Sequence, residues 1–311
     1  DYRLLTDQTS RFAGLAAAPE VIVSLGGGSV IDSAKVFAAA TGDFEKVRTY
    51  LETQQGAEEL SATPIIAVPT TAGTGSEVTC WGTVWDEANC KKYSLARPNL
   101  YRTHAVIDPV LMAGKSRQLT ISTGLDALSH SLESLWNVNS NPVSANHAVF
   151  AARKTLDVLP KLARDLGNIE LRSQMAMAAL FAGLAFSNTK TAVAHSLSYP
   201  ITLRHGVQHG VACSFSLPMI LRSVGGATEL CDSSLRQIFG PDLAGGAALL
   251  EDFLGKLGVS CNPASYGIER PEWRDLVIDS LKGERGKNFA GSKESLLEAA
   301  GATWLPEVQT A

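Results

Sequence analysis

The chain has 311 residues, of which 45% are hydrophobic and 19% charged, and its formal net charge at pH 7 is −4. This composition is typical of a globular protein large enough for two domains, and it favours neither a nucleic-acid partner nor a membrane. The five cysteines form no CxxC pair, which is typical of reduced thiols and predicts a cytoplasmic protein.

A glycine turn follows the first predicted strand. Residues 21–25 are an apolar run typical of a buried parallel strand. The turn consists of Gly26, Gly27, Gly28 and Ser29, and a predicted helix begins directly after it. Such a unit presents backbone N–H groups to a phosphate, although it also fits a tight turn without a ligand. It is not the GxGxxG fingerprint of dinucleotide-binding folds.

A second loop has a composition suited to the same kind of ligand. Residues 65–68 predict another buried strand, which ends at Pro69. The loop at residues 70–76 is rich in hydroxyl groups and glycine and suits contacts with a ribose or pyrophosphate. One such loop is more simply a solvated loop, but two of them after two parallel strands indicate a bound nucleotide.

Strand patterns end in the first third of the chain. Residues 79–96 predict a β-ribbon, which offers an edge for oligomerisation, and a last strand is expected at residues 105–107. Residues 43–62 are expected to form a polar surface excursion. Helical periodicity takes over near residues 109–118, so we expect a domain boundary there.

Four side chains in the helical part suggest a metal site. Asp126 and His130 are four residues apart, so they lie on one face of a helix. His195 lies on a predicted helix that ends at Pro200, and His209 lies where a loop meets a helix. One carboxylate and three imidazoles suit Fe(II), Zn or Ni. The same spacing also allows a purely structural hydrogen bond between Asp126 and His130.

Five motifs occur in the order found in one enzyme family. GGGSVIDSAK, PTTAGTGSE, GLDALSH, AVAH and HGVQHGVACSFSLP together resemble the iron-containing (group III) alcohol dehydrogenases. The resemblance implies an α/β N-terminal dinucleotide-binding domain and an all-α C-terminal metal domain, similar to dehydroquinate synthase. We expect the nicotinamide-cofactor domain at residues 1–112 and the metal-binding catalytic domain at residues 113–311.

The resemblance also implies site residues. The metal ligands, for Fe(II) or alternatively Zn, are Asp126, His130, His195 and His209. The residues that bind NAD or NADP are Gly26, Gly27, Gly28, Ser29, Asp32, Thr70, Thr71, Thr74, Ser76 and, near the ribose, Lys92. Members of the family usually carry a longer segment before the glycine turn, including the residue that reads the adenosine ribose. The choice between NAD and NADP, and the completeness of the chain, are therefore left open.

The chain departs from the family pattern near His195. Tyr199 stands where many members have a further active-site histidine, and Lys190 replaces a small residue. We expect Tyr199 or His205 to relay a proton. Lys190 and Arg204 are expected to hold an anionic substrate group, unless both are solvated surface charges. This segment most resembles the phosphonoacetaldehyde reductases of phosphonate metabolism.

The predicted reaction is the metal-dependent, NAD(P)H-linked reduction of a small aldehyde to a primary alcohol, first of all phosphonoacetaldehyde to 2-hydroxyethylphosphonate. Alternatives within the family are a short-chain alcohol or lactaldehyde-type dehydrogenase without anionic preference, and maleylacetate reductase. A lyase of the dehydroquinate synthase type would need more basic residues. A non-enzymatic alternative is a metal-binding protein with a degraded cofactor half. We expect a homo-oligomer, such as a dimer.

Overall fold

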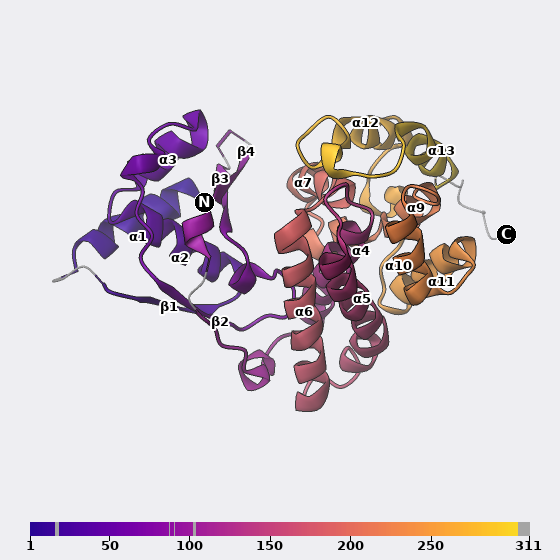
Figure 1. Cartoon of the computed structure of the whole chain (residues 1–311), viewed down its shortest axis with the longest axis horizontal. Coiled ribbons are helices and arrows are strands. Elements are labelled where there is room, and N and C mark those ends of the chain that lie inside the picture. Colours follow the sequence, from indigo (N-terminus) through magenta and orange to yellow (C-terminus); the bar gives the residue numbers. More distant parts are fainter. Residues whose placement is uncertain (16–18, 87, 90, 102–103, 304–311) are drawn as a thin grey trace.

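The computed structural model describes residues 1–15, 19–86, 88–89, 91–101 and 104–303. Figure 1 shows an α/β part, coloured indigo to magenta, beside a purely helical part, coloured dark magenta to yellow. This arrangement confirms the predicted fold class. The N-terminal part contains α1 (Tyr2–Ala13), β1 (Ile22–Gly26), α2 (Gly28–Ala40), α3 (Phe44–Thr53), β2 (Ile65–Pro69), β3 (Trp81–Asp86), β4 (Lys91–Ala96) and β5 (His104–Ala105).

Three parallel strands form the sheet of the N-terminal part, in the order β1-β2-β5. Gly26 pairs with Pro69 in the register of β1 and β2, so the loops after these two strands leave from the same edge. Helix α2 packs against β1 and β2. On the other face Val23 and Leu25 are exposed, which corrects the expectation of a fully buried first strand.

The predicted β-ribbon is confirmed, since β3 and β4 pair in antiparallel fashion. Strand β5 is shorter than expected. The prediction of a surface excursion at residues 43–62 is wrong, because this segment contains α3. Phe44, Val47 and Leu51 recur at helical spacing and are buried, and Asp43 caps the helix by accepting a hydrogen bond from the Glu45 N–H at 3.0 Å.

Helices build the described C-terminal part around one large apolar core. The helices are α4 (Arg117–Leu135), α5 (Pro142–Leu162), α6 (Ile169–Thr189), α7 (Val193–His205), α8 (His209–Ser214), α9 (Leu217–Ser223), α10 (Glu229–Phe239), α11 (Leu243–Lys256), α12 (Arg270–Ser280) and α13 (Lys293–Thr303). Helices α4, α5 and α6 pack on one another. By length and composition α6 would pass for a membrane span, but half of its most apolar window is buried, as in the core helix of a globular protein.

Helix α7 does not end at Pro200, contrary to the expectation. It continues to His205, with Pro200 inside it. Proline removes one backbone hydrogen bond from a helix, but Leu197 and Ile201 on either side are fully buried, and this packing favours continuation of the helix.

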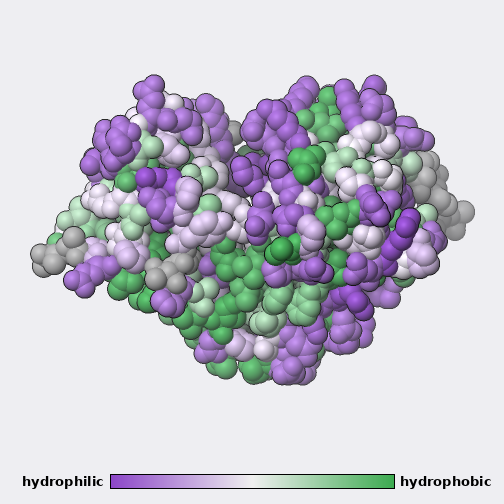
Figure 2. Space-filling model, viewed as in Figure 1, coloured by the Kyte–Doolittle hydropathy of each residue, from purple (hydrophilic) through white to green (hydrophobic). Residues whose placement is uncertain are grey.

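The loop after β2 joins the two parts of the molecule. A Cβ atom on Gly73 would lie 2.6 Å from the Thr123 carbonyl oxygen on α4, and one on Gly75 would lie 2.6 Å from the Gly183 Cα on α6. Only glycine allows so close an approach of two backbones. Between the two parts the surface is hollowed (Figure 2).

Candidate metal centre

Helix α4 presents three chemically active side chains on one face. Asp126, His130 and Glu133 are spaced by four and three residues, and all three are buried. The Nε2 atom of His130 lies 3.8 Å from the Asp126 Oδ1 atom. The His130 ring stacks on Phe186 at 4.0 Å and on His195 at 4.6 Å between ring centres.

Glu133 fixes the orientation of His195. Its Oε1 accepts hydrogen bonds from the backbone N–H groups of Ala194, at 2.6 Å, and His195, at 3.2 Å, at the N-terminus of α7. Its Oε2 lies 2.5 Å from the His195 Nδ1 atom. A carboxylate is favoured at the positive end of a helix. Because the Glu133 carboxylate can only accept a hydrogen bond, Nδ1 is the protonated nitrogen of His195. The other nitrogen, Nε2, is thus turned toward Asp126.

A close contact between α8 and α4 brings His209 to the same place. A Cβ atom on Gly210 would lie only 1.8 Å from the Ser122 carbonyl oxygen. His209 precedes this glycine, and its Nε2 atom lies 3.9 Å from the Asp126 Oδ1 atom. Its side chain is 37% exposed, whereas that of His195 is 3% exposed, so the centre opens toward His209.

The three predicted histidine ligands therefore face one oxygen atom of the fourth predicted ligand, Asp126. The Nε2 atoms of His130, His195 and His209 lie 3.8, 3.4 and 3.9 Å from Asp126 Oδ1. Both Asp126 Oδ1 and His195 Nε2 are buried without a hydrogen-bond partner in the described part of the chain. Buried polar atoms are rarely left unsatisfied, and metal–ligand distances near 2 Å imply ligand atoms about 3–3.5 Å apart. The residues fit a divalent metal.

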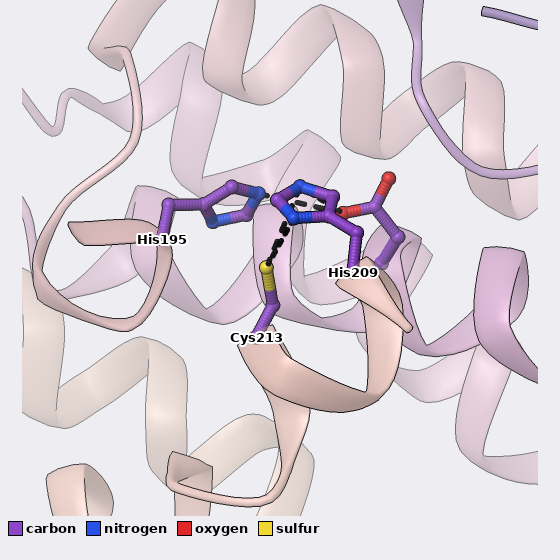
Figure 3. Close-up of side chains that lie close together, drawn as sticks. His195, His209 and Cys213 are labelled. Carbon is purple, nitrogen blue, oxygen red and sulfur yellow. Dashed lines mark hydrogen bonds and ion pairs between the residues drawn. The ribbon is translucent and has the colours of Figure 1, made fainter. Parts of the chain in front are cut away.

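Cys213 is a possible ligand that the sequence analysis missed. Asp126, His195, His209 and Cys213 place one ligand atom each within 4.8 Å of one another. His130 is outside this tightest group, although its Nε2 faces Asp126. Figure 3 shows the imidazoles of His195 and His209 and the thiol of Cys213 converging. The signal was available, because Cys213 lies four residues after His209 on the same helix.

The charges of the cluster are strongly coupled. Burial alone would raise the pKa of the Asp126 carboxyl, but His130, His195 and His209 hold it well below its usual range. Burial lowers the pKa of His130 to about 4, despite the opposing charge of Asp126. Burial alone would also raise the pKa of the Cys213 thiol, but His195 and His209 lower it to about 7. Burial alone would lower the pKa values of His195 and His209, but Cys213 and Asp126 raise them, so a bound metal would displace protons from these two imidazoles.

The two predicted cofactor loops lie against each other. A Cβ atom on Gly27 would lie 3.2 Å from the Thr71 Oγ1 atom, and one on Gly28 would lie 2.7 Å from the Thr74 side chain. Helix α2 begins at Gly28 and has no side-chain cap among the described residues. Its first N–H groups can thus serve an anion, so the loops fit a dinucleotide pyrophosphate.

Asp32 and Ser76 bind each other within this region. The Asp32 Oδ1 atom accepts hydrogen bonds from Ser76 Oγ, at 2.6 Å, and from the buried Lys35 Nζ, at 3.2 Å. Its Oδ2 atom accepts one from the Thr83 N–H at 2.8 Å. Both residues thereby hold the second loop against α2, and their predicted contact with the cofactor stays a prediction. Among the described residues, the Ser29 and Thr70 side chains have no polar contact.

Tyr199 borders the open side of the metal centre. Its ring is parallel to that of His209, with 5.8 Å between ring centres. Two cations lie over the same ring, namely Lys92 Nζ at 3.7 Å and Arg285 Cζ at 4.9 Å from its centre. Burial alone would raise the pKa of the Tyr199 phenol, but Lys92 and Arg285 lower it to about 8. Sequence reasoning missed Arg285, which no local pattern connects to this site.

The structure does not bring the other three predicted residues to the cluster. His205 Nε2 lies 2.9 Å from Glu272 Oε1, at the far end of α7. Arg204 is 64% exposed and lies 3.9 Å from the same carboxylate. Lys190 is exposed just after α6, in a backbone conformation with φ of 65°. Their predicted roles stay predictions.

Two family models match the chain. The model for iron-containing alcohol dehydrogenases matches residues 7–109, and the model for the C-terminal part of that family matches residues 120–287. Together they cover both parts of the structure and all four predicted metal ligands.

Curated relatives belong to the same class. The chain is 36% identical over 208 residues to the phosphonoacetaldehyde reductase of Streptomyces viridochromogenes, covering 65% of this chain and 53% of the relative. It is 35% identical over 203 residues to the NAD-dependent methanol dehydrogenase of Bacillus methanolicus, covering 65% and 52%. The long-chain-alcohol dehydrogenase 1 of Geobacillus thermodenitrificans is 30% identical over 90% of this chain and 72% of its own length. The chain spans about half the length of the first two relatives.

Among solved structures, the sulfoacetaldehyde reductase of Bifidobacterium kashiwanohense in complex with NAD+ matches with a TM-score of 0.88. The two sequences are 28% identical, and the match covers 100% of this chain and 81% of that one. An iron-containing alcohol dehydrogenase from Thermotoga maritima matches with a TM-score of 0.79 and 28% identity, over 97% and 80% of the two chains.

Proposed function

Because the chain belongs to the iron-containing alcohol dehydrogenase family, we propose that it is a metal-dependent oxidoreductase that reduces a small aldehyde to a primary alcohol with NAD(P)H. One observation carries this proposal. Three imidazole nitrogens converge on an unsatisfied buried carboxylate oxygen, next to a cleft bordered by two loops that fit a dinucleotide.

When bound, the metal (Fe(II), or Zn as the alternative) supplies a Lewis acid for the carbonyl oxygen, and the nicotinamide supplies the hydride. Asp126, His130, His195 and His209 would hold the metal, and Cys213 is close enough to join them. Glu133 keeps His195 Nε2 pointing inward. The loops at residues 26–29 and 70–76 would hold the cofactor pyrophosphate, with the N-terminus of α2 favouring its charge.

The product alkoxide needs a proton. Tyr199 is better placed than His205 to deliver it, because its ring lies against His209, whereas His205 faces Glu272. A phenol with a pKa near 8 is well matched to proton transfer at neutral pH. Tyr199 would hold this proton at its hydroxyl oxygen, and Lys92 and Arg285 would stabilise the phenolate that remains.

We propose phosphonoacetaldehyde as the substrate and 2-hydroxyethylphosphonate as the product. Support comes from two relatives, one named a phosphonoacetaldehyde reductase and one a sulfoacetaldehyde reductase. Both names describe a two-carbon aldehyde that carries an anionic group. A neutral short-chain aldehyde is the second candidate, because a methanol dehydrogenase is almost as similar in sequence.

A cytoplasmic location and a homo-oligomeric state belong to the same proposal. The cysteines that the structure describes, Cys80, Cys213, Cys231 and Cys261, are all free thiols, which suits a reducing compartment. Within the described part of the chain, the ribbon of β3 and β4 pairs with no third strand, so its edges can pair with a second copy of the chain.

The experiment is NADH and NADPH oxidation by the full-length, Fe(II)-loaded protein, with phosphonoacetaldehyde compared with propanal. A higher kcat/KM for phosphonoacetaldehyde supports the proposed substrate. Turnover of propanal alone supports the neutral alternative. Absence of any turnover by protein shown to contain iron would overturn the enzymatic proposal.

A further inference from the structure

We propose that Arg285 and Lys92, one from each part of the chain, form an oxyanion-binding subsite beside Tyr199 that selects substrates with a phosphonate or sulfonate group. The inference deepens the proposed function and rests on it for the position of the aldehyde. It assigns the anion to residues other than Lys190 and Arg204.

Arg285 is a half-buried cation without a carboxylate partner in the described part of the chain. It lies just before the short helix at Gly286–Asn288, and its Nε atom donates a hydrogen bond to Thr191 Oγ1 at 3.1 Å. Thr191 is itself buried at the start of the segment that leads into α7. This bond fixes the plane of the guanidinium, whose remaining N–H groups have no partner among the described residues and can bind two oxygens of one anion.

Lys92 reaches the same place from β4. Its Nζ atom lies 3.7 Å from the centre of the Tyr199 ring and 5.4 Å from that of Trp85. Trp85 and Tyr199 are in edge contact at 6.2 Å between ring centres. Lys92 also has no acidic partner among the residues that the structure describes. The aromatic walls leave its ammonium group partly shielded from water, where an added anion interacts more strongly.

Several other cations of the protein are arranged differently. Lys161, Lys256, Lys282 and Lys287 are exposed and each pairs with a carboxylate on its own helix or turn. Arg204 shares Glu272 with His205. Two half-buried cations over one ring repel each other and lose hydration, so the arrangement is costly unless an anion joins them.

The location suits a short anionic aldehyde. Tyr199 connects the subsite to the metal centre through its 5.8 Å contact with His209. Because both cations lie over the ring that stacks on His209, this placement suits a short spacer between carbonyl and oxyanion, whereas a long aliphatic chain would have to pass the Lys92 and Arg285 charges.

The first test measures binding without catalysis. The affinity for ethylphosphonate is measured by calorimetric titration of the iron-loaded protein, and it should fall about 10- to 100-fold in Arg285→Ala. The loss should be smaller in Arg285→Lys, because lysine keeps the charge but cannot donate two parallel hydrogen bonds. Lys287→Ala is the matched control, because it removes an exposed cation two residues away, and it should bind ethylphosphonate like the wild type. Equal affinity in Arg285→Ala and Lys287→Ala would overturn the subsite.

A kinetic test separates the subsite from its rivals. Arg285→Ala and Lys92→Met should raise the ratio of the KM for phosphonoacetaldehyde to the KM for propanal about 10- to 100-fold, whereas loss of phenolate stabilisation lowers kcat for both aldehydes alike. If Lys92→Met raises the KM for NADH with both aldehydes instead, Lys92 contacts the cofactor ribose and the two-cation subsite is wrong. A loss confined to Lys190→Ala or Arg204→Ala would likewise contradict it.

The two proposals fail in different ways. Arg285-dependent binding of ethylphosphonate by a protein that reduces no aldehyde would keep the subsite and overturn the proposed reaction. Turnover of propanal by a protein that does not bind ethylphosphonate would keep the reaction and overturn the subsite.

Discussion

The Glu133 carboxylate decides which nitrogen of His195 faces the metal centre. It accepts three hydrogen bonds from the start of α7, including the one from the His195 ring. Burial alone would raise the pKa of Glu133, but His195 and the backbone N–H groups lower it, so the side chain is a carboxylate at neutral pH. The Glu133 carboxylate thus orients the His195 ring and is not itself one of the predicted metal ligands.

We expect Glu133→Gln to weaken iron binding about 10- to 100-fold, because an amide neither fixes the His195 tautomer nor raises its basicity. Anaerobic titration with Fe(II) measures the change. The matched control is Glu272→Gln, which removes the carboxylate that holds His205 at the other end of α7. Equal weakening in both variants would show that general loosening of α7, and not the Glu133–His195 bond, sets the affinity.

Asp126 and His130 could be paired from the sequence because four-residue spacing on a helix is a local rule. The role of Glu133 could not be predicted from the sequence, because its partner His195 lies 62 residues away and the orientation of α7 is decided by tertiary packing. Arg285 is more distant still, since it lies 94 positions after Thr191 in the sequence. Local patterns thus predicted the ligand types, whereas the groups that orient them depend on long-range contacts.

At the scale of the element, tight backbone packing positions the ligands. Helix α8 touches α4 through Gly210, and the loop after β2 touches α6 through Gly75. The sequence predicted the strands and most helices from their periodicity. It failed at α3 and at Pro200, where burial of one apolar face outweighs a polar composition or a lost hydrogen bond.

We expect Gly210→Ala to destabilise the protein by about 1–3 kcal/mol and to weaken iron binding, because its Cβ would overlap the Ser122 carbonyl and move His209. Urea unfolding of the iron-free protein and Fe(II) titration measure the two effects. Gly255→Ala is the control, since nothing lies near its Cβ in the last turn of α11 and alanine should stabilise that helix by up to about 1 kcal/mol. Unchanged iron affinity in Gly210→Ala would contradict the positioning role of this contact.

Glu77 makes the loop after β2 sensitive to pH. It is 5% exposed, and burial raises its pKa to about 7, although Lys35 opposes the shift. A carboxyl whose folded-state pKa lies above its unfolded value costs stability as pH rises from about 4.5 to about 7, because the unfolded chain loses the proton first.

We therefore expect the stability of Glu77→Gln relative to the wild type to rise by up to roughly 3 kcal/mol between pH 4.5 and pH 8, since glutamine does not titrate. Urea unfolding at both pH values gives the difference for each protein. A difference that is constant with pH, or that falls as pH rises, would show that the carboxyl ionises as easily in the folded protein as in the unfolded chain.

At the scale of the whole molecule, the site exists only where the two parts meet. The helical part supplies the metal ligands, the α/β part supplies the cofactor loops, and Lys92 crosses from β4 to Tyr199 on α7. The fold class and family could be predicted because ordered motifs mark both parts. The composition of the cleft could not, because it depends on how the ribbon of β3 and β4 sits against α7.

Metal stoichiometry tests the central claim most directly. The iron content of the full-length protein, after anaerobic reconstitution with Fe(II) and removal of free metal, should be one ion per chain, and Asp126→Asn should lose it. Asp157→Asn, which changes an exposed aspartate on α5, should retain the ion. Absence of iron from the wild type, or retention of it by Asp126→Asn, would contradict a metal centre built on Asp126.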